Sequence, residues 1–206
     1  MLTTLALVLT LVPTRADSVE HYYAHGNATA LRSHCQTAAS QAEDLLCRYR
    51  LYPLTMDRTL LDDLPSETES ASARENAILA GLWGYKAATG SIINKIRCGR
   101  RAGRLMERAK ESGPDDPFVL LIEGQSLLFR PGFFGGDSRR ALEVLRELQR
   151  VTASDSEGGV STVEADLWVW YALTRLKDPD ADAARMAIES RNPPPMYAEF
   201  LANPPS

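Results

Sequence analysis

Residue patterns typical of active sites are scarce in this chain. It has three histidines and three cysteines among 206 residues. His21 and His25 have a spacing at which two histidines can bind zinc, but the stretch lacks the Glu of the metalloprotease motif, so we expect ordinary surface or partly buried histidines. It has neither a G-x-S-x-G nucleophile motif nor a Gly-rich phosphate loop. The paired acids Asp62-Asp63 and Asp115-Asp116 fall in expected loops, where carboxylates are mostly solvated. The sequence therefore predicts no enzyme activity, no metal site and no cofactor.

Two long-range patterns are also absent. No segment alternates between apolar and polar residues with period two, so we expect no β-strands. The long apolar run at residues 2–12 is too short to span a bilayer. Hydrophobic residues make up 44% of the chain and charged residues 24%, which excludes wholesale disorder. The formal net charge of −4 argues against nucleic acid as the main partner.

The N-terminal run has the features of a secretory signal peptide. Residues 2–12 have the length of the apolar core of such a peptide, and Thr14-Arg15-Ala16 is similar to the small-residue pattern of a cleavage site before Asp17. We therefore predict that residues 1–16 are a signal peptide and that the protein is periplasmic or secreted. No side chain before Leu5 is positively charged, so an ordinary N-terminal helix, or a true start at another position, stays open as an alternative.

A pattern of small and large apolar residues is the most informative feature present. In its first copy, Ala102, Met106, Ala109 and Pro114 follow the spacing A-x3-F-x2-A-x4-P, after a helix that carries residues 82–85, Leu-Trp-Gly-Tyr. Small residues suit positions where two helices of a hairpin touch, and the larger ones reach the next hairpin. We therefore expect Gly84, within the first helix, to lie at a helix contact.

Two more copies follow. The second, residues 118–150, has Gly124 in place of Gly84, and the third carries Trp168 and Tyr171. The remaining positions are Ala141, Leu145 and Leu148 in the second copy, and Ala172, Ala184 and Ile188 in the third. Over residues 73–195 the chain resembles tetratricopeptide-like repeats, with two enlarged turns. A Phe-Gly-Gly-Asp turn at residues 134–137 is similar to one in bacterial exported proteins of this type.

The resemblance implies an all-α fold in which antiparallel helix hairpins stack as a short right-handed solenoid. We expect about three hairpins in a repeat region at residues 73–206, preceded by an N-terminal helical region and linker at 17–72. The implied function is an exported scaffold that binds another protein or peptide without catalysis, with an acidic partner as one option. The alternative is a periplasmic small-ligand binding or transport-accessory protein that uses the cleft between hairpins. The oligomeric state is left open.

Local signals indicate where helices begin and end. Asn27 is placed to cap a helix that starts at Ala28, and Ser72 to cap the first repeat helix. Pro117 suits a first helical turn. Pro53 is expected to stop the helix that precedes it.

The cysteines allow two interpretations. On one continuous helix, Cys35 and Cys47 would lie ~18 Å apart, whereas a disulfide needs Cα atoms within ~4.4–6.8 Å. They can therefore pair only if the chain turns between them, near Ser40. The alternative is that all three, Cys98 included, are small buried residues.

Two features are candidate binding sites. Five arginines form one stripe of the predicted second helix: Arg97, Arg100, Arg101, Arg104 and Arg108. Four of them, Arg97, Arg101, Arg104 and Arg108, are the candidate binding residues. They are either a solvated face or a site for an acidic peptide, anionic lipid head groups or a phosphate-bearing ligand. The second feature is the pair Phe133 and Phe134, which either fills the core between hairpins or forms an exposed aromatic loop that grips a partner.

Overall fold

The computed structural model describes residues 15–70, 72–154 and 159–205. Over this part the chain is helical and contains no strand, so the all-α prediction is confirmed. The α-helices are α1 Arg15–Ala24, α2 Ala28–Cys35, α3 Gln41–Thr55, α4 Ala73–Thr89, α5 Ile92–Ser112, α6 Pro117–Phe129, α7 Ser138–Ser154, α8 Thr162–Leu176, α9 Ala181–Glu189 and α10 Pro195–Ala202. Two 3-10 turns, η1 Arg58–Leu61 and η2 Gly132–Phe134, lie in connections. Most of the predicted signal peptide, residues 1–14, lies outside the described residues.

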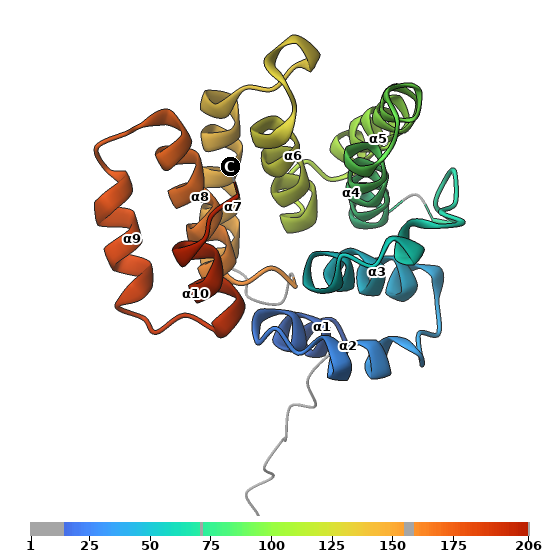
Figure 1. Cartoon of the computed structure of the whole chain (residues 1–206), viewed down its shortest axis with the longest axis horizontal. Helices are drawn as coiled ribbons and strands as arrows, with labels where there is room; N and C mark the ends of the chain where they lie inside the picture. Colours follow the sequence, from blue (N-terminus) through green and yellow to red (C-terminus); the bar gives the residue numbers. More distant parts are fainter. Residues whose placement is uncertain (1–14, 71, 155–158, 206) are drawn as a thin grey trace, which may run out of the picture.

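Consecutive helices pack in pairs (Figure 1). Helix α4 packs on α5, α6 on α7, and α8 on α9, while α4–α6 and α7–α8 contacts join neighbouring pairs. The N-terminal helices α1, α2 and α3 contact one another, and α3 continues onto α4. Helix α10 packs on both α8 and α1. The first and last described helices are therefore in contact.

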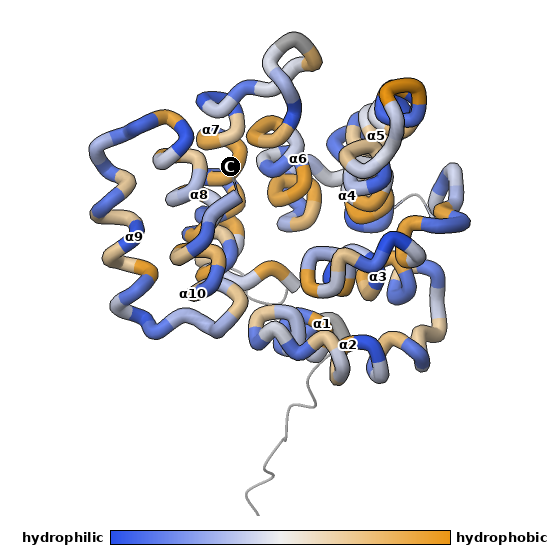
Figure 2. The backbone as a smooth tube through the Cα atoms, viewed as in Figure 1, coloured by the Kyte–Doolittle hydropathy of each residue, from blue (hydrophilic) through white to orange (hydrophobic). Residues whose placement is uncertain are grey.

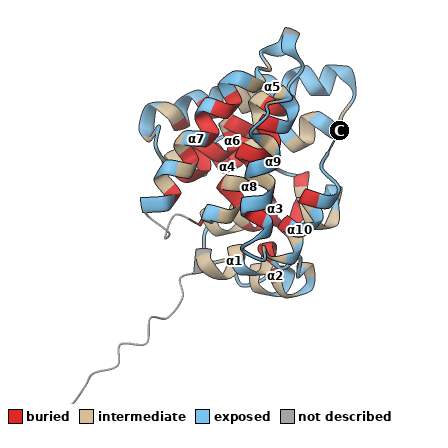
Figure 3. Cartoon of the chain, turned by 90° about the vertical axis from the view of Figure 1, so that its left-hand side faces the viewer, coloured by how far each residue is buried: buried red, intermediate tan, exposed pale blue. Residues whose placement is uncertain are grey.

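The apolar residues of these helices meet in one continuous core. Its centre lies where α4, α6, α7 and α8 come together, and Figure 3 shows the buried residues concentrated there. Helix α5, which pairs with α4, and helix α9, which pairs with α8, lie at opposite sides of the molecule in Figure 1. Each of these two helices buries only one of its sides. Their outer sides are therefore available for contact with other molecules.

The predicted helix starts are confirmed, and one predicted stop is wrong. Asn27 Oδ1 accepts a hydrogen bond from the Ala30 amide at 3.0 Å, and Ser72 caps α4 by accepting from the Glu75 amide. Pro117 is the first residue of α6. Pro53, however, lies inside α3, which continues to Thr55. A proline in the last turn removes only one intrahelical hydrogen bond, so the helix tolerates it there.

Glycine contacts confirm one predicted helix contact and correct another. A Cβ on Gly124 would lie 2.5 Å from Leu145 of the paired helix, so α6 and α7 touch there as predicted. Gly84 is exposed, and a Cβ there would meet nothing within 4 Å, so its predicted contact is wrong. The close contact of α4 is one turn earlier, at Gly81, where a Cβ would lie 2.8 Å from the Tyr49 ring of α3. Helix α4 therefore packs closely on α3 at Gly81, and it makes no close contact with α5 at Gly84.

A disulfide joins α2 to α3. Cys35 and Cys47 are bonded, with their Cα atoms 5.7 Å apart. The chain turns between them, and Ser40 caps α3 by accepting a hydrogen bond from the Glu43 amide at 3.2 Å. The turn that pairing requires is therefore present. The interpretation of all three cysteines as unpaired buried residues is wrong, since only Cys98 is free and buried.

Candidate binding surface and buried arginine network

The four predicted arginines lie along the outer side of α5. The inner side of this helix buries Cys98, Leu105, Met106 and Ala109 against α4 and its neighbours. Arg97, Arg104 and Arg108 are exposed. Arg101 is half-buried because its guanidinium packs 4.7 Å from the centre of the Trp83 ring. The structure therefore brings the four side chains onto one surface, with Arg101 at its edge.

Among the residues that the structure describes, most of this positive charge has no acidic partner. Arg108 lies 3.5 Å from Glu67, and Arg97 donates to the Asn94 side chain at 3.2 Å. Among the described residues, no carboxylate lies within 4.0 Å of Arg97, Arg101 or Arg104. Residues 76–106 contain six lysines and arginines and no acidic residue, although the whole chain is acidic. The outer side of α5 therefore has a locally positive potential that attracts anions.

Three isoleucines at the start of α5 were missed by sequence reasoning. Ile92, Ile93 and Ile96 are 77%, 79% and 43% exposed. They stand at the tip of the α4–α5 pair, where the tube in Figure 2 is strongly apolar. A polar surface rarely holds three large apolar side chains within two helical turns, and such clusters often mark contact sites. The available signal was the string Ile-Ile-Asn-Lys-Ile beside the arginines.

Two glycines extend this apolar surface along α5. Ile92, Ile96, Gly99 and Gly103 follow the spacing i, i+4, i+7, i+11, which places them on one side of a helix. A Cβ at Gly99 or Gly103 would meet nothing within 4 Å, so the space above both is open. We call these four residues the α5 stripe. It gives another helix room to approach the backbone closely, and the exposed Arg100 and Arg104 are the arginines nearest to one border.

The Phe133-Phe134 loop is held by its glycines. Gly135 has a φ of +88°, and a Cβ on Gly136 would lie 1.7 Å from the Arg130 carbonyl oxygen, so only glycine fits there. Phe134 is exposed, so the interpretation in which both phenylalanines fill the core is wrong for Phe134. The side chain of Phe133 lies outside what the structure describes. The loop belongs to the α6–α7 pair and the arginines to α4–α5, so the two features lie on neighbouring pairs (Figure 1).

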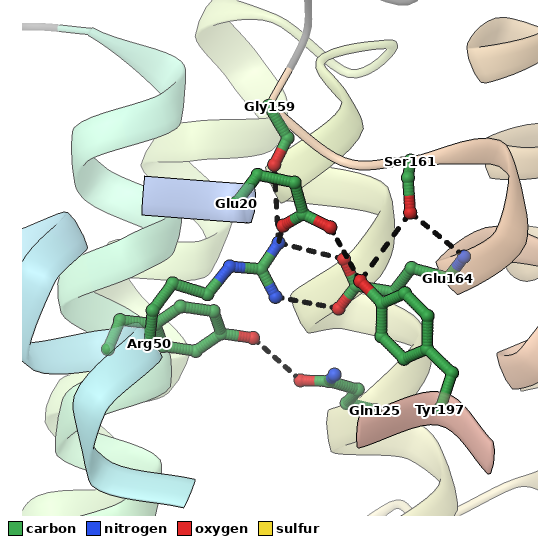
Figure 4. A network of polar contacts seen from close by, with 8 residues as sticks. Glu20, Arg50, Gln125, Gly159, Ser161, Glu164 and Tyr197 are labelled. Carbon is green, nitrogen blue, oxygen red and sulfur yellow. Dashed lines mark hydrogen bonds and ion pairs between the residues drawn. The ribbon is translucent and has the colours of Figure 1, made fainter. Parts of the chain in front are cut away.

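A second polar site, not predicted from the sequence, is buried around Arg50 (Figure 4). This side chain of α3 is 2% exposed. Its Nη1 and Nη2 donate to the two carboxylate oxygens of Glu164 at 2.6 and 2.8 Å, a bidentate pair. Nη2 also donates to the Gly159 carbonyl at 3.2 Å. Burial makes these bonds strong, because water does not compete for them.

One guanidinium in this network faces two carboxylates. Glu20 of α1 places Oε2 3.0 Å from Arg50 Nη2, but without the geometry of a hydrogen bond. Its Oε1 accepts from the Tyr197 hydroxyl of α10 at 2.5 Å. Burial, together with the negative charge of Glu164, outweighs the attraction of Arg50 and raises the pKa of Glu20 from 4.5 to about 7. Burial also raises the pKa of the Tyr23 and Tyr197 hydroxyls, so both stay protonated.

The network joins helices that are distant in sequence. Arg50 and Glu164 are separated by 114 positions, and Glu20 and Tyr197 by 177. Together they fasten α3 to α8 and α1 to α10. Both carboxylate oxygens of Glu164 are occupied by Arg50, so the arrangement is suited to holding helices together and not to proton transfer with a substrate.

Other candidate sites are weak. The described residues contain no group of three or more side chains able to hold a metal ion. Two open hollows, of about 360 and 300 Å³, lie beside Arg32 on α2 and between Arg130 and Arg175. None of the described helices is both long enough and apolar enough to cross a bilayer. A comparison of the chain with protein-family models, curated proteins and solved structures found no match in any of the three.

Proposed function

We propose that this protein is an exported helical-repeat scaffold that binds acidic, partly apolar segments of proteins on the outer side of α5. The observation that carries the proposal is the coincidence of exposed isoleucines with Arg97, Arg101 and Arg104, which have no acidic partner among the described residues. Apolar groups supply most binding free energy, and charges select and orient the partner. The pairs α4–α5, α6–α7 and α8–α9 are taken as the tetratricopeptide-like hairpins of a short right-handed solenoid.

Export is part of the proposal. Residues 1–16 have the composition of a signal peptide. The Cys35–Cys47 disulfide supports an oxidising compartment, since such bonds are uncommon in the reducing cytosol. The periplasm or the extracellular space meets both conditions.

Small-ligand binding is the less favoured function. Ligand pockets are typically concave, mostly apolar and about 300–1,000 Å³ in volume. The two hollows reach only the lower end of that range and are open to solvent. Neither gathers the buried polar groups that would orient a small molecule. The exposed surface of α5 offers more apolar area and more unpaired charge.

The proposal is tested with a defined probe, a fluorescent amphipathic peptide with leucines on one face and glutamates on the other. We expect the protein to bind it, and the Arg97→Gln/Arg104→Gln variant to bind at least roughly tenfold more weakly, since a charge-assisted hydrogen bond contributes ~1.5–3 kcal/mol. Added salt should weaken binding to the wild type more than to the variant. The matched control is Arg139→Gln/Arg146→Gln on the exposed side of α7. Equal affinity for wild type and both variants would reject α5 as the site.

A further inference from the structure

Helix α9 has the surface properties that the α5 stripe requires of a partner. Its inner side buries Ile188 against α8, and its outer side exposes Ala183, Met186 and Ala187. Met186 is 63% exposed. Three small or flexible apolar residues at the spacing i, i+3, i+4 form a short apolar strip on the outer side of this helix.

Acidic residues border the strip on α9. Asp180 and Asp182 are exposed, and among the described residues no cation lies within 4.0 Å of either. The basic residue of this helix, Arg185, is neutralised by Glu189 at 2.8 Å and packs on the Trp170 ring. The outer side of α9 is therefore acidic where the outer side of α5 is basic.

We propose that the α5 stripe of one molecule binds the outer side of α9 of a second copy of this chain. The inference rests on the proposed function, because it names the partner of the same surface. Met186 would enter the space above Gly99 and Gly103, where a Cβ would meet no atom of the described residues within 4 Å. Packed helices are typically 8–10 Å apart, and glycines favour the short end of that range. Asp182 would then face Arg104 across the interface.

The positions of the two helices decide the kind of assembly. Helices α5 and α9 lie at opposite sides of the molecule, so one copy cannot satisfy its own stripe (Figure 1). Each molecule offers one surface of each type, and the contact is therefore head to tail. Such a contact either closes into a ring of copies or extends as an open chain with a free surface at each end.

The size of the contact sets its strength. One face of α5 against the short helix α9 buries less than the ~800 Å² per partner of a standard stable interface. Association is therefore weak, concentration-dependent and sensitive to salt, because the arginines and aspartates are exposed. A foreign acidic helix or an anionic membrane is the competing occupant of the same surface.

The experiment uses two variants, each with one blocked surface. Ile96→Glu/Arg104→Glu blocks α5, and Asp182→Lys/Met186→Lys blocks α9. Sedimentation velocity of the purified wild type over a hundredfold range of concentration should show reversible growth beyond a dimer. Each variant alone should stay monomeric, while their equimolar mixture should form a one-to-one dimer that grows no further. Arg139→Glu on α7 serves as a control that should assemble like the wild type, and circular dichroism checks that each variant is folded.

Each contrary result has a defined meaning. A monomeric wild type, or a mixture of the variants that stays monomeric, would overturn the inference. Association of the α9-blocked variant alone would also overturn it, since α5 would then pair with itself. If the wild type binds the acidic peptide but does not self-associate, the inference fails and the proposed function stands. If the wild type binds phosphatidylglycerol vesicles but neither the peptide nor a second copy, the outer side of α5 is a lipid-binding surface and both proposals fail.

Discussion

The buried network leads to a prediction about the pH dependence of stability. Replacing Arg50 with methionine leaves Glu164, which is 1% exposed, and Glu20, which is 14% exposed, without a countercharge. Removing one partner of a buried ion pair typically costs 3–5 kcal/mol. The native state of a typical domain is stable by only ~5–15 kcal/mol. We therefore expect Arg50→Met to remove about a third or more of the folding free energy at neutral pH.

Removing the charge of Glu20 should have the opposite effect on stability at neutral pH. Its pKa is raised from 4.5 to about 7 in the folded protein, so the folded state holds a proton that the unfolded chain has lost between these values. The free energy of unfolding therefore falls as pH rises through this window, and it levels off above pH ~7. Each pKa unit corresponds to 1.36 kcal/mol, so the loss reaches about 3 kcal/mol. Glu20→Gln removes this titration and keeps a side chain that bonds to Tyr197.

The assay is urea denaturation followed by circular dichroism at pH 5 and pH 8. Other carboxylates titrate too, so the informative quantity is the difference between wild type and Glu20→Gln at each pH. The variant should gain stability relative to the wild type on going from pH 5 to pH 8. An identical pH dependence of the two proteins would refute the reasoning. If Arg50→Met does not fold, Arg50→Met/Glu20→Gln/Glu164→Gln should recover part of the loss, because no uncompensated charge then remains buried.

Three further predictions concern packing, the disulfide and export. Gly124→Val should overpack the α6–α7 contact and cost ~1–3 kcal/mol of stability. Gly84→Ala, at an open helical position, should instead stabilise the protein by up to ~1 kcal/mol. Thermal melting of both variants tests this, and equal shifts of the melting temperature would contradict the contacts described at the two glycines. Reduction of Cys35–Cys47, or its replacement by serines, should lower stability by ~3 kcal/mol, measured with and without dithiothreitol. Protein purified from its native host should lack residues 1–16, and an intact Met1 on the mature protein would argue against export.

Local features of the fold were predictable because they depend on neighbouring residues. Asn27, Ser72 and Pro117 act on backbone groups within one turn, and each begins its helix as predicted. The contact at Gly124 was also predicted, but the one expected at Gly84 is at Gly81. The spacing of small residues predicts which side of a helix can pack closely on a neighbour. Which turn of that side makes the contact depends on where the neighbouring helices lie.

The site was less predictable because it depends on residues far apart in the chain. Nothing near Arg50 indicates that its partner is Glu164, 114 positions away. The buried arginine was signalled only by its place between apolar neighbours in α3. Ile92 and Ile93 belong to a residue type that is usually buried, and they are exposed because α5 begins at the tip of its pair. Their exposure depends on where the α4–α5 pair ends, and the amino-acid composition of the segment does not specify that point.

The contact between α1 and α10 has a consequence for how the molecule unfolds and how it can evolve. Open arrays of helical repeats gain or lose units easily, because each unit contacts only its neighbours. Here the Glu20–Tyr197 hydrogen bond joins α1 to α10, the first and last described helices, so adding or deleting one helix pair would pull them apart. We therefore expect this contact to disfavour changes in the number of pairs, and the chain to unfold as one cooperative unit and not pair by pair.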